Sequence, residues 1–399
     1  MKDEMKKYLV PSYYKNFSCK CGKCRNSCCK GWNISISMNE YYSLSTLDCS
    51  KEIRNKLDRA LKVLNKPTKE KYAILASNYF GDCFLHDEDG YCALQKECGE
   101  KSLPQICRMY PRSTCNSFLN QACVSNSCER VIEILMENTD KLEFLNLNTS
   151  LYDNKENISI DDESYGLQIQ QICIEVISDR NYPLMVRLIR LEELIIDLEK
   201  NGFDVMKNNY QNNLYSQSKK DIVDYDKGAK LHLDVLKIIG EKSPSLSEYL
   251  LDIENYYHIN LKTDDINDFD GKGKLYLDAL HTFKEKNPNW DIFVEKVLIN
   301  HMFYISFPFE DESLNGIKNK KVNYYKQFVA LFEAYCFFKF VVSSYMKVKN
   351  EETNYKDILV DITGEVFRLI EHSSFDNNVS IILFNEKYFD KESLDKLLD

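Results

Sequence analysis

Cysteine is the residue type in this chain whose distribution points most directly to chemistry. Thirteen of the fifteen cysteines lie between residues 19 and 128, and the 271 residues that follow hold only Cys173 and Cys336. Thiolates bind zinc and iron–sulfur clusters, and clustered cysteines in an intracellular protein indicate metal or redox chemistry more often than disulfides. The distribution therefore predicts a metal-binding or iron–sulfur module near the N-terminus.

The first group of cysteines lies in the segment FSCKCGKCRNSCCKGW, which holds Cys19, Cys21, Cys24, Cys28 and Cys29. Ligands of one centre must converge, and such short spacings let one tight loop supply several sulfurs. Basic residues between them would lower the thiol pKa values and offset the charge of bound thiolates; these are Lys20, Lys23, Arg25 and Lys30. We expect a metal or cluster role for this group.

The second group is more widely spaced and consists of Cys83, Cys92, Cys98, Cys107, Cys115, Cys123 and Cys128. Such spacings do not define a site by themselves. They make sense if these residues fold back onto the first group or build a second centre. Turn signals at Gly81-Asp82 and Asp89-Gly90 favour a small hairpin around Cys83 and Cys92.

The spacing alone leaves both zinc and iron–sulfur open. His86 is the only histidine within residues 1–128, and cysteine-only ligation fits an iron–sulfur cluster as well as zinc. The CxxxCxxC motif of most radical S-adenosylmethionine enzymes is absent, because Cys21, Cys24 and Cys28 run in the reverse order. The nucleotide-binding loops GxGxxG and GxxxxGK[ST] are absent as well.

The motifs nevertheless resemble those of a known family, the flagellin lysine-N-methylases, which are related to proteins with a putative zinc- or iron-chelating CxxCxxxCC domain. The resemblance lies in Cys19-x4-Cys24-x3-Cys28-Cys29-x-Gly31-Trp32, Cys83-x-Leu85, Asp87-x-Asp89-Gly90-x-Cys92, Cys107-Arg108-x-Tyr110-Pro111-Arg112 and Ser127-Cys128. It continues faintly into the rest of the chain at Asn300-His301 and Phe307-Pro308-Phe309. Glu129 directly follows Cys128, where the family usually has a proline first.

The resemblance implies transfer of methyl groups from S-adenosylmethionine to lysines of flagellin, with a [4Fe–4S] cluster and zinc as the alternative. The implied metal ligands are Cys19, Cys24, Cys28, Cys29, Cys83, Cys92, Cys107 and Cys128, which are enough for two centres. Cys21, Cys98, Cys115 and Cys123 fall outside the pattern.

Three residues are candidates for binding the cofactor. Arg108 and Arg112 flank Tyr110-Pro111, and their guanidinium groups could compensate cluster charge, grip the cofactor carboxylate or form ordinary salt bridges. Trp32 could stack on an adenine or pack in a core. The catalytic base that a lysine methyl transfer needs is not identified by the sequence.

An acidic turn beside Cys83 holds Asp82, Asp87, Glu88 and Asp89. It is either a solvated turn or a receptor for a substrate lysine. A different class of function also fits the cysteines: a non-catalytic zinc- or iron-binding protein that stores or delivers metal, or that uses metal to staple an interaction module.

The elements that must position these residues are mainly helical. We expect an irregular cysteine-rich metal-binding module over residues 1–130, packed on an all-helical C-terminal body over residues 131–399. Apolar spacing at Ile53, Leu57, Leu61 and Leu64 predicts a helix within residues 39–76, and residues 146–163 read as a polar linker. Further helices are expected over residues 168–200, with a break near Pro183, and over 227–261, 274–285, 290–304, 322–346 and 356–372.

The charge distribution limits the partners. Residues 1–128 carry 20 Lys and Arg against 13 Asp and Glu, whereas the rest carries 32 against 49. An acidic body disfavours nucleic acid and suits a lysine-bearing protein such as flagellin. No apolar leader stands at the N-terminus, and the apolar run Phe328–Met346 contains Glu333 and Lys339, so we expect a cytoplasmic protein without a membrane span.

Overall fold

The structure is a computed structural model that describes residues 5–114, 120–149, 163–215, 223–240, 246–309 and 323–373, together with residues 375, 379, 382 and 383. Helices α1 to α14 dominate the described residues, so the prediction of a mainly helical protein is confirmed. Short 3₁₀ helices cover Ser12–Asn16, Cys21–Lys23, Glu100–Ser102 and Ile266–Phe269.

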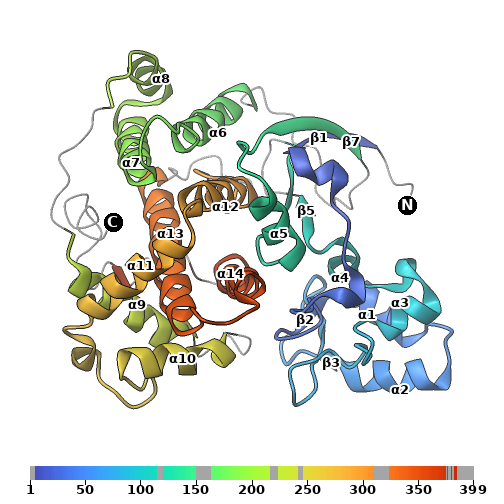
Figure 1. Cartoon of the computed structure of the whole chain (residues 1–399). Helices are drawn as coiled ribbons and strands as arrows, with labels where there is room; N and C mark the ends of the chain where they lie inside the picture. The colour runs from blue at the N-terminus through green and yellow to red at the C-terminus, as the bar shows by residue number, and fades with distance from the viewer. Residues whose placement is uncertain are drawn as a thin grey trace.

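The helical body is built around α13 (Tyr324–Val348), which runs through its centre in Figure 1. It packs against α7 (Leu184–Asn201), α9 (Tyr225–Ile239), α10 (Ser247–Tyr257), α11 (Gly273–Lys286) and α14 (Tyr355–His372). Among the described residues α13 is the one helix long and apolar enough to cross a membrane, yet its most apolar window is entirely buried. It is therefore a core helix, as expected from its apolar run.

Most of the predicted helices of the body are confirmed. The first long stretch forms α6 (Glu163–Ile177) and α7, and Pro183 precedes the first residue of α7, because proline favours a helix start and opposes a helix interior. The helix α12 has the predicted bounds, Trp290–Tyr304. The remaining helix, α8 (Phe203–Gln211), follows Gly202, whose φ of 83° ends α7.

The cysteine-rich part contains short elements. They are α1 (Met38–Ser45), α2 (Lys51–Ala60), α3 (Ala93–Cys98), α4 (Gln105–Met109) and a three-stranded sheet of order β2-β4-β3, with β2 Ile34–Ile36, β3 Leu61–Val63 and β4 Ala73–Leu75. The prediction of helix within residues 39–76 is confirmed for α1 and α2, which are separate helices, and is wrong beyond Ala60. Leu61 begins β3 and pairs with Leu75, so a strand contact takes the place of the next helical turn.

Residues from both ends of this part join it to the body. Strand β1 (Lys6–Pro11) pairs antiparallel with β7 (Phe144–Thr149), and β5 (Arg112–Thr114) pairs with β6 (Ala122–Val124). The expected linker over residues 146–163 is therefore wrong at its start, where β7 lies, and residues 150–162 lie outside the described part. Because β7 lies within residues 131–399, the prediction that this part of the chain is all-helical is wrong there.

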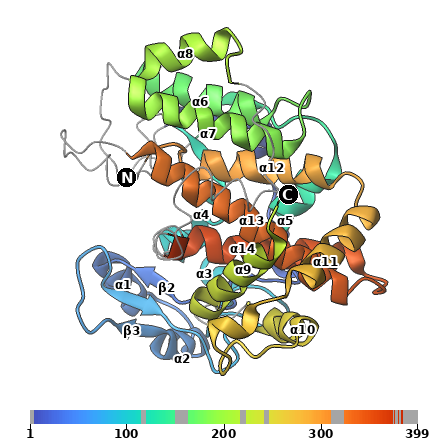
Figure 2. The same cartoon turned by 90° about the vertical axis from the view of Figure 1, so that its left-hand side faces the viewer.

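Two main buried cores underlie this arrangement in the part of the chain that the structure describes. A small core holds residues between Ile36 and Leu94, whereas the large core of the body also takes in Tyr8, Val10, Ala122 and Val124. Helix α5 (Glu129–Glu137) lies between the two parts in Figure 1, and Figure 2 shows α1, α2, β2 and β3 grouped apart from the long helices. The division of the chain at residue 130 stays a prediction.

Candidate functional site

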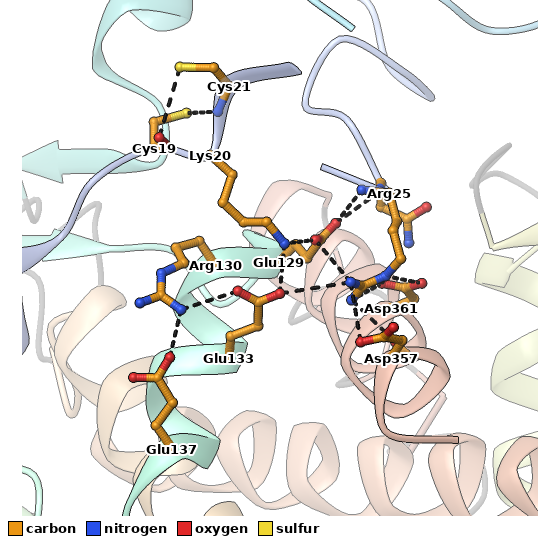
Figure 3. A network of polar contacts seen from close by, with 11 residues as sticks. Cys19, Lys20, Cys21, Arg25, Glu129, Arg130, Glu133, Glu137, Asp357 and Asp361 are labelled. Carbon is orange, nitrogen blue, oxygen red and sulfur yellow. Dashed lines mark hydrogen bonds and ion pairs between the residues drawn. The ribbon is translucent and has the colours of Figure 1, made fainter. Parts of the chain in front are cut away.

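The loop that carries the first cysteines is held by one buried carboxylate, that of Glu129 at the start of α5 (Figure 3). Its side chain is only 1% exposed and accepts hydrogen bonds from Lys20 Nζ and from two backbone amides, Arg25 N at 2.7 Å and Asn26 N at 3.0 Å. A buried carboxylate needs such donors to offset its desolvation. Glu129 thus fixes the loop between Cys19 and Cys28 beside Cys128.

The same ionic network continues from α5 to α14. Lys20 also pairs with Glu133 at 2.7 Å, and the Arg25 guanidinium pairs with Asp361 at 3.0 Å and with Asp357 at 3.3 Å. Burial raises the pKa of Asp361, and its bond with Arg25 opposes that change. These ion pairs of Arg25 therefore join the cysteine loop to α14, which is a helix of the body (Figure 3).

Four of the predicted ligands form a first quartet, defined as Cys19, Cys24, Cys28 and Cys128. Burial raises the pKa of Cys24 to about 12, with further contributions from Glu129, Cys128 and Cys19 in that order. Burial raises the pKa of Cys128 to about 11, and Cys19 acts in the same direction. These sulfurs lie close enough to raise one another's pKa values, which the Glu129 anchor explains.

The other four predicted ligands form a second quartet, defined as Cys29, Cys83, Cys92 and Cys107. Backbone pairing brings three of them together: Cys83 N donates to Cys29 O at 2.7 Å, and His86 and Cys92 form a β-bridge. The turns at Gly81 and Gly90 flank these pairs, so the predicted hairpin signals are confirmed as turns.

Cys107 reaches this group from α4. The start of α4 is positioned by Glu40, whose carboxylate accepts the amide of Gln105 at 2.8 Å. Burial raises the pKa of Cys107, and Cys29, Cys83 and Cys92 act in the same direction. The adjacent Cys28 and Cys29 lie where the two quartets meet: Cys28 is influenced by Cys19 and Cys128 as well as by Cys29, whereas Cys29 is the cysteine that acts most on Cys107. A mutual hydrogen bond raises the pKa of Cys28 and lowers that of Cys29 to about 6.

Two glycines let the cysteine segments approach each other. A Cβ on Gly90, where φ is 80°, would lie 2.5 Å from Gly22 O, and a Cβ on Gly22 would lie 2.6 Å from Asp89 O. No side chain fits at such distances. The first cysteine loop and the turn before Cys92 therefore pack backbone against backbone.

Of the remaining cysteines, Cys21 lies exposed beside the first quartet, where its amide donates to Cys19 Sγ at 3.2 Å. Cys49 and Cys98 border the small core, Cys123 is buried in β6, and Cys115 lies outside the described residues. Within the part of the chain that the structure describes, no three Cys, His, Asp or Glu side chains already meet in a metal-binding geometry. The eight ligand assignments stay a prediction, and the quartets describe how the chain groups them.

The predicted cofactor residues are engaged with the protein itself. Trp32 Nε1 donates to Cys28 O at 2.8 Å, and the Arg368 guanidinium lies over its ring at 4.8 Å. Arg112 donates to Phe17 O at 3.2 Å and covers the Phe17 ring, whereas Arg108 lies within α4. The structure brings Trp32, but not Arg112, against the first quartet. Binding of a cofactor by these three residues stays a prediction.

The acidic turn beside Cys83 binds lysines of this chain. Asp87 contacts Lys56 Nζ at 2.5 Å and Lys96 Nζ at 3.1 Å, and Asp89 contacts Lys96 at 2.7 Å. The bond with Lys56 lowers the pKa of the Asp87 carboxyl below its ordinary value. The turn therefore ties α2 and α3 to the second quartet.

Sequence reasoning missed a polar group on the body side of the junction. Ser125, Ser127, His301, Glu371 and His372 are linked by hydrogen bonds next to Cys128. In the sequence, Ser127 and His301 stand in motifs that resemble those of the family, whereas nothing singles out Ser125, Glu371 or His372. Asn300 is fully buried and donates to Val124 O at 2.8 Å, so it ties α12 to β6 directly before this group.

A hollow of about 220 Å³ lies at the opposite end of α5. It is lined by residues that include Leu135, Asn138, Trp290 and Phe293. Nine helical residues span roughly 13 Å, so this hollow is not next to Cys128.

Comparison with known proteins agrees with the family expected from the cysteine motifs. Two curated relatives named Lysine-N-methylase, from Salmonella choleraesuis (strain SC-B67) and Salmonella typhimurium (strain LT2), are 28% identical over 137 residues, which is 33% of this chain and 33% of each relative. The Flagellar biosynthetic protein FliU of Salmonella muenchen is 28% identical over 33% of this chain and 78% of its own length.

The matched part thus spans about a third of the length of the two lysine-N-methylases. No solved structure matches the chain. A family model described as the FliB lysine N-methylase C-terminal domain matches residues 170–397. Because that model covers more than half of the sequence, the chain belongs to the family of the FliB lysine N-methylase C-terminal domain.

Proposed function

We propose that this chain is a protein-lysine N-methyltransferase that moves methyl groups from S-adenosylmethionine to lysines of flagellin and carries an iron–sulfur centre. Membership in the FliB lysine N-methylase family supports the methyl transfer. The name of the FliU relative, a flagellar biosynthetic protein, supports flagellin as the protein substrate. The acidic balance of the residues after 128 suits a substrate that presents lysine.

The observation that carries the proposal is the grouping of eight cysteines into two quartets at the junction with the helical body. The donor set of each quartet is sulfur only, which fits the ligation of a [4Fe–4S] cluster. Zinc accepts the same donors and is the alternative. We propose that Cys19, Cys24, Cys28 and Cys128 hold one centre, and that Cys29, Cys83, Cys92 and Cys107 hold a second.

The surrounding ion pairs hold the loops of both quartets in place and add no net positive charge to them. Lys20 and Arg25 lie in the loop of the first quartet, but the carboxylates of α5 and α14 that pair with them offset their charge. Beside the second quartet, Asp87 and Asp89 offset the charge of Lys56 and Lys96. A cluster near the methyl donor would orient it or exchange electrons with it, while the chain binds and deprotonates the lysine.

Metal analysis tests the centre. Protein purified without oxygen is expected to be brown and to contain iron and acid-labile sulfide. Cys24→Ser and Cys92→Ser are each expected to remove about half of the iron, because each variant breaks one four-thiolate set. Cys98→Ser, which changes a cysteine at the border of the small core and outside both quartets, is the matched control and should keep the full amount.

Two outcomes would contradict this part of the proposal. Colourless protein with stoichiometric zinc and no iron would show that the cysteines bind a structural zinc ion and not an iron–sulfur cluster. Equal and complete loss of iron in both variants would show that the eight cysteines serve one centre and not two. The methyl transfer is tested separately, with S-adenosylmethionine labelled in its methyl group and flagellin as acceptor.

A further inference from the structure

Two aromatic rings stand together in solvent on the turn that precedes Cys83. Tyr79 is 96% exposed and Phe80 is 76% exposed, which makes them the two most exposed large apolar residues in the part of the chain that the structure describes. Their ring centroids are 5.5 Å apart, and the ring planes are nearly perpendicular. Both rings lie outside the two main cores, so they offer their apolar surface to another molecule. We call residues 78–82 the aromatic turn.

Hydrogen bonds to Asn78 hold the aromatic turn in one conformation. The Asn78 side-chain oxygen accepts the amides of Phe80 at 2.9 Å and Asp82 at 3.0 Å, and its own amide donates to Asp82 O at 2.7 Å. Gly81, whose amide donates to Asn78 O at 3.1 Å, supplies the φ of 84° that closes the turn. A rigid turn loses little conformational entropy when a partner binds, so its rings are preorganised for contact.

The aromatic turn is attached to the loop that follows Cys29. Gly31 N donates to Gly81 O at 2.9 Å, and Ser77, at the base of the turn, forms an antiparallel bridge with Cys83. The rings therefore stand beside two of the segments that carry the second quartet. A protein that covers the rings lies against the candidate site.

The size of this surface favours a transient partner over a second copy of the chain. Burial of a tyrosine or phenylalanine removes about 150–250 Å² from water, so the two rings bury at most about 500 Å². Even with an equal area on the partner, the total stays below the roughly 1,200 Å² of a stable complex. A few aromatic anchors can still supply much of the binding free energy of a transient complex, such as that of an enzyme with a protein substrate.

The charges beside the rings suit a partner that presents lysine. The side chain of Asp82 is 32% exposed, and that of Glu248 on α10 is 64% exposed. Lys30 lies between these two carboxylates, since it bridges to Asp82 and pairs with Glu248 at 3.3 Å, and one cation does not offset both. The His86 imidazole, 3.9 Å from Asp82, is outside hydrogen-bonding distance. Negative charge next to an apolar anchor attracts a lysine-bearing surface.

We propose that the aromatic turn is the docking anchor for flagellin, with Tyr79 and Phe80 entering an apolar recess of the substrate that is bordered by lysine. The inference rests on the proposed function. Binding at the turn holds flagellin against the cysteine-rich part while its target lysine reacts. The turn thus sets the affinity for the whole substrate protein and takes no part in the methyl transfer itself.

Calorimetry of flagellin binding tests the anchor, with the full chain handled without oxygen and without S-adenosylmethionine. The double variant Tyr79→Ser/Phe80→Ser is expected to bind flagellin roughly 10–100-fold more weakly than the unchanged protein, because it lacks both aromatic anchors. Iron content and thermal stability should not change, since both side chains are exposed.

Tyr165→Ser is the matched control. Tyr165 on α6 is 50% exposed and also has an edge-to-face aromatic partner, Phe203 at 5.2 Å, but it belongs to the helical body. This variant should bind flagellin as tightly as the unchanged protein.

Kinetics separate docking from chemistry. With flagellin as acceptor, the KM of the double variant should rise by a similar factor while its kcat stays the same. With a short peptide around a target lysine, which lacks the docking recess, both constants should match those of the unchanged protein.

Equal affinity of the double variant and the unchanged protein for flagellin would overturn the anchor. A dimer of the chain, or binding to anionic lipid vesicles, that the double substitution abolishes would also overturn it, because the rings would then have a different partner. Weaker flagellin binding by the double variant of a chain that transfers no methyl groups would support the anchor and contradict only the proposed activity.

Discussion

At the scale of single residues, the side chains that organise the site are the anchors next to the cysteines. Glu129 holds the loop of the first quartet by accepting hydrogen bonds from Lys20 Nζ and from the backbone amides of Arg25 and Asn26. Glu40 positions Cys107 through Gln105, and Asp87 ties the second quartet to α2. Ligand loops need such supporting contacts, because a metal site is set as much by what orients its ligands as by the ligands.

Replacing Glu129 by glutamine tests this anchor. The change removes the charge that Lys20 and Arg25 face while keeping the size of the side chain. We expect the free energy of unfolding to fall by about 1–3 kcal/mol, because buried donors lose a charged acceptor, and the bound iron to become sensitive to air. Urea unfolding and iron analysis measure both effects.

Glu137→Gln is the matched control on the same helix, since Glu137 is 52% exposed. It should change stability by less than about 0.5 kcal/mol, as is usual for an exposed position. If Glu129→Gln behaves like this control, Glu129 is not the anchor of the loop.

At the scale of elements, the two cysteine segments meet because glycine stands at their contact. Gly90→Ala is expected to displace the turn before Cys92, because its Cβ would lie 2.5 Å from Gly22 O in a backbone with φ of 80°. Iron bound by the second quartet should fall with it. Gly99→Ala is the control: it has nearly the same φ, 79°, but no atom lies within 4 Å of its Cβ. Equal losses in the two variants would assign the effect to backbone strain and not to the close approach.

The sequence predicts the long helices well because their apolar stretches are long, and α12 and α13 are buried on nearly every side. The bounds of α12 and the break before α7 follow from the apolar pattern and from Pro183. It misplaces the segment after Ala60, because Leu61 and Leu64 continue a helical spacing while the backbone pairs with β4. A three-residue strand is set by its partner across the sheet, which a local pattern does not contain.

The candidate site, like the fold, could be predicted only in part from the sequence. The resemblance to the family's motifs implies the eight candidate ligands, but their division into two groups depends on which distant segment each cysteine meets. The hydrogen-bonded group of Ser125, Ser127 and His372 was not predicted, because Ser127 and His372 lie 245 residues apart in the sequence and His372 stands in none of the motifs. Only folding brings α14 against the turn before α5.

At the scale of the whole molecule, the two main cores of the described residues differ greatly in how many apolar side chains they bury. The body buries a dense set of aliphatic and aromatic side chains around α13. The small core between Ile36 and Leu94 is far smaller and adjoins the second quartet through Cys83 and Cys92. Small cores commonly depend on metals or other cross-links for stability.

Removal of metal is therefore expected to loosen one part of the molecule. After chelation, hydrogen exchange should speed up in residues 19–107 and stay slow in α13, which is buried throughout. The reason is that the second quartet supplements a small core, while the body keeps its own. Uniform loss of protection across both parts would show that the two are one cooperative unit.

The central claim, methyl transfer to flagellin lysines, is tested most directly by mass spectrometry of flagellin after incubation with the oxygen-free protein and S-adenosylmethionine. We predict methylated lysines in the presence of the iron-replete protein, and none when both quartets are disabled by Cys24→Ser and Cys92→Ser. Flagellin that stays unmodified with iron-replete protein would contradict the proposed activity, and methylation by the doubly substituted protein would contradict a role for the cysteine centres.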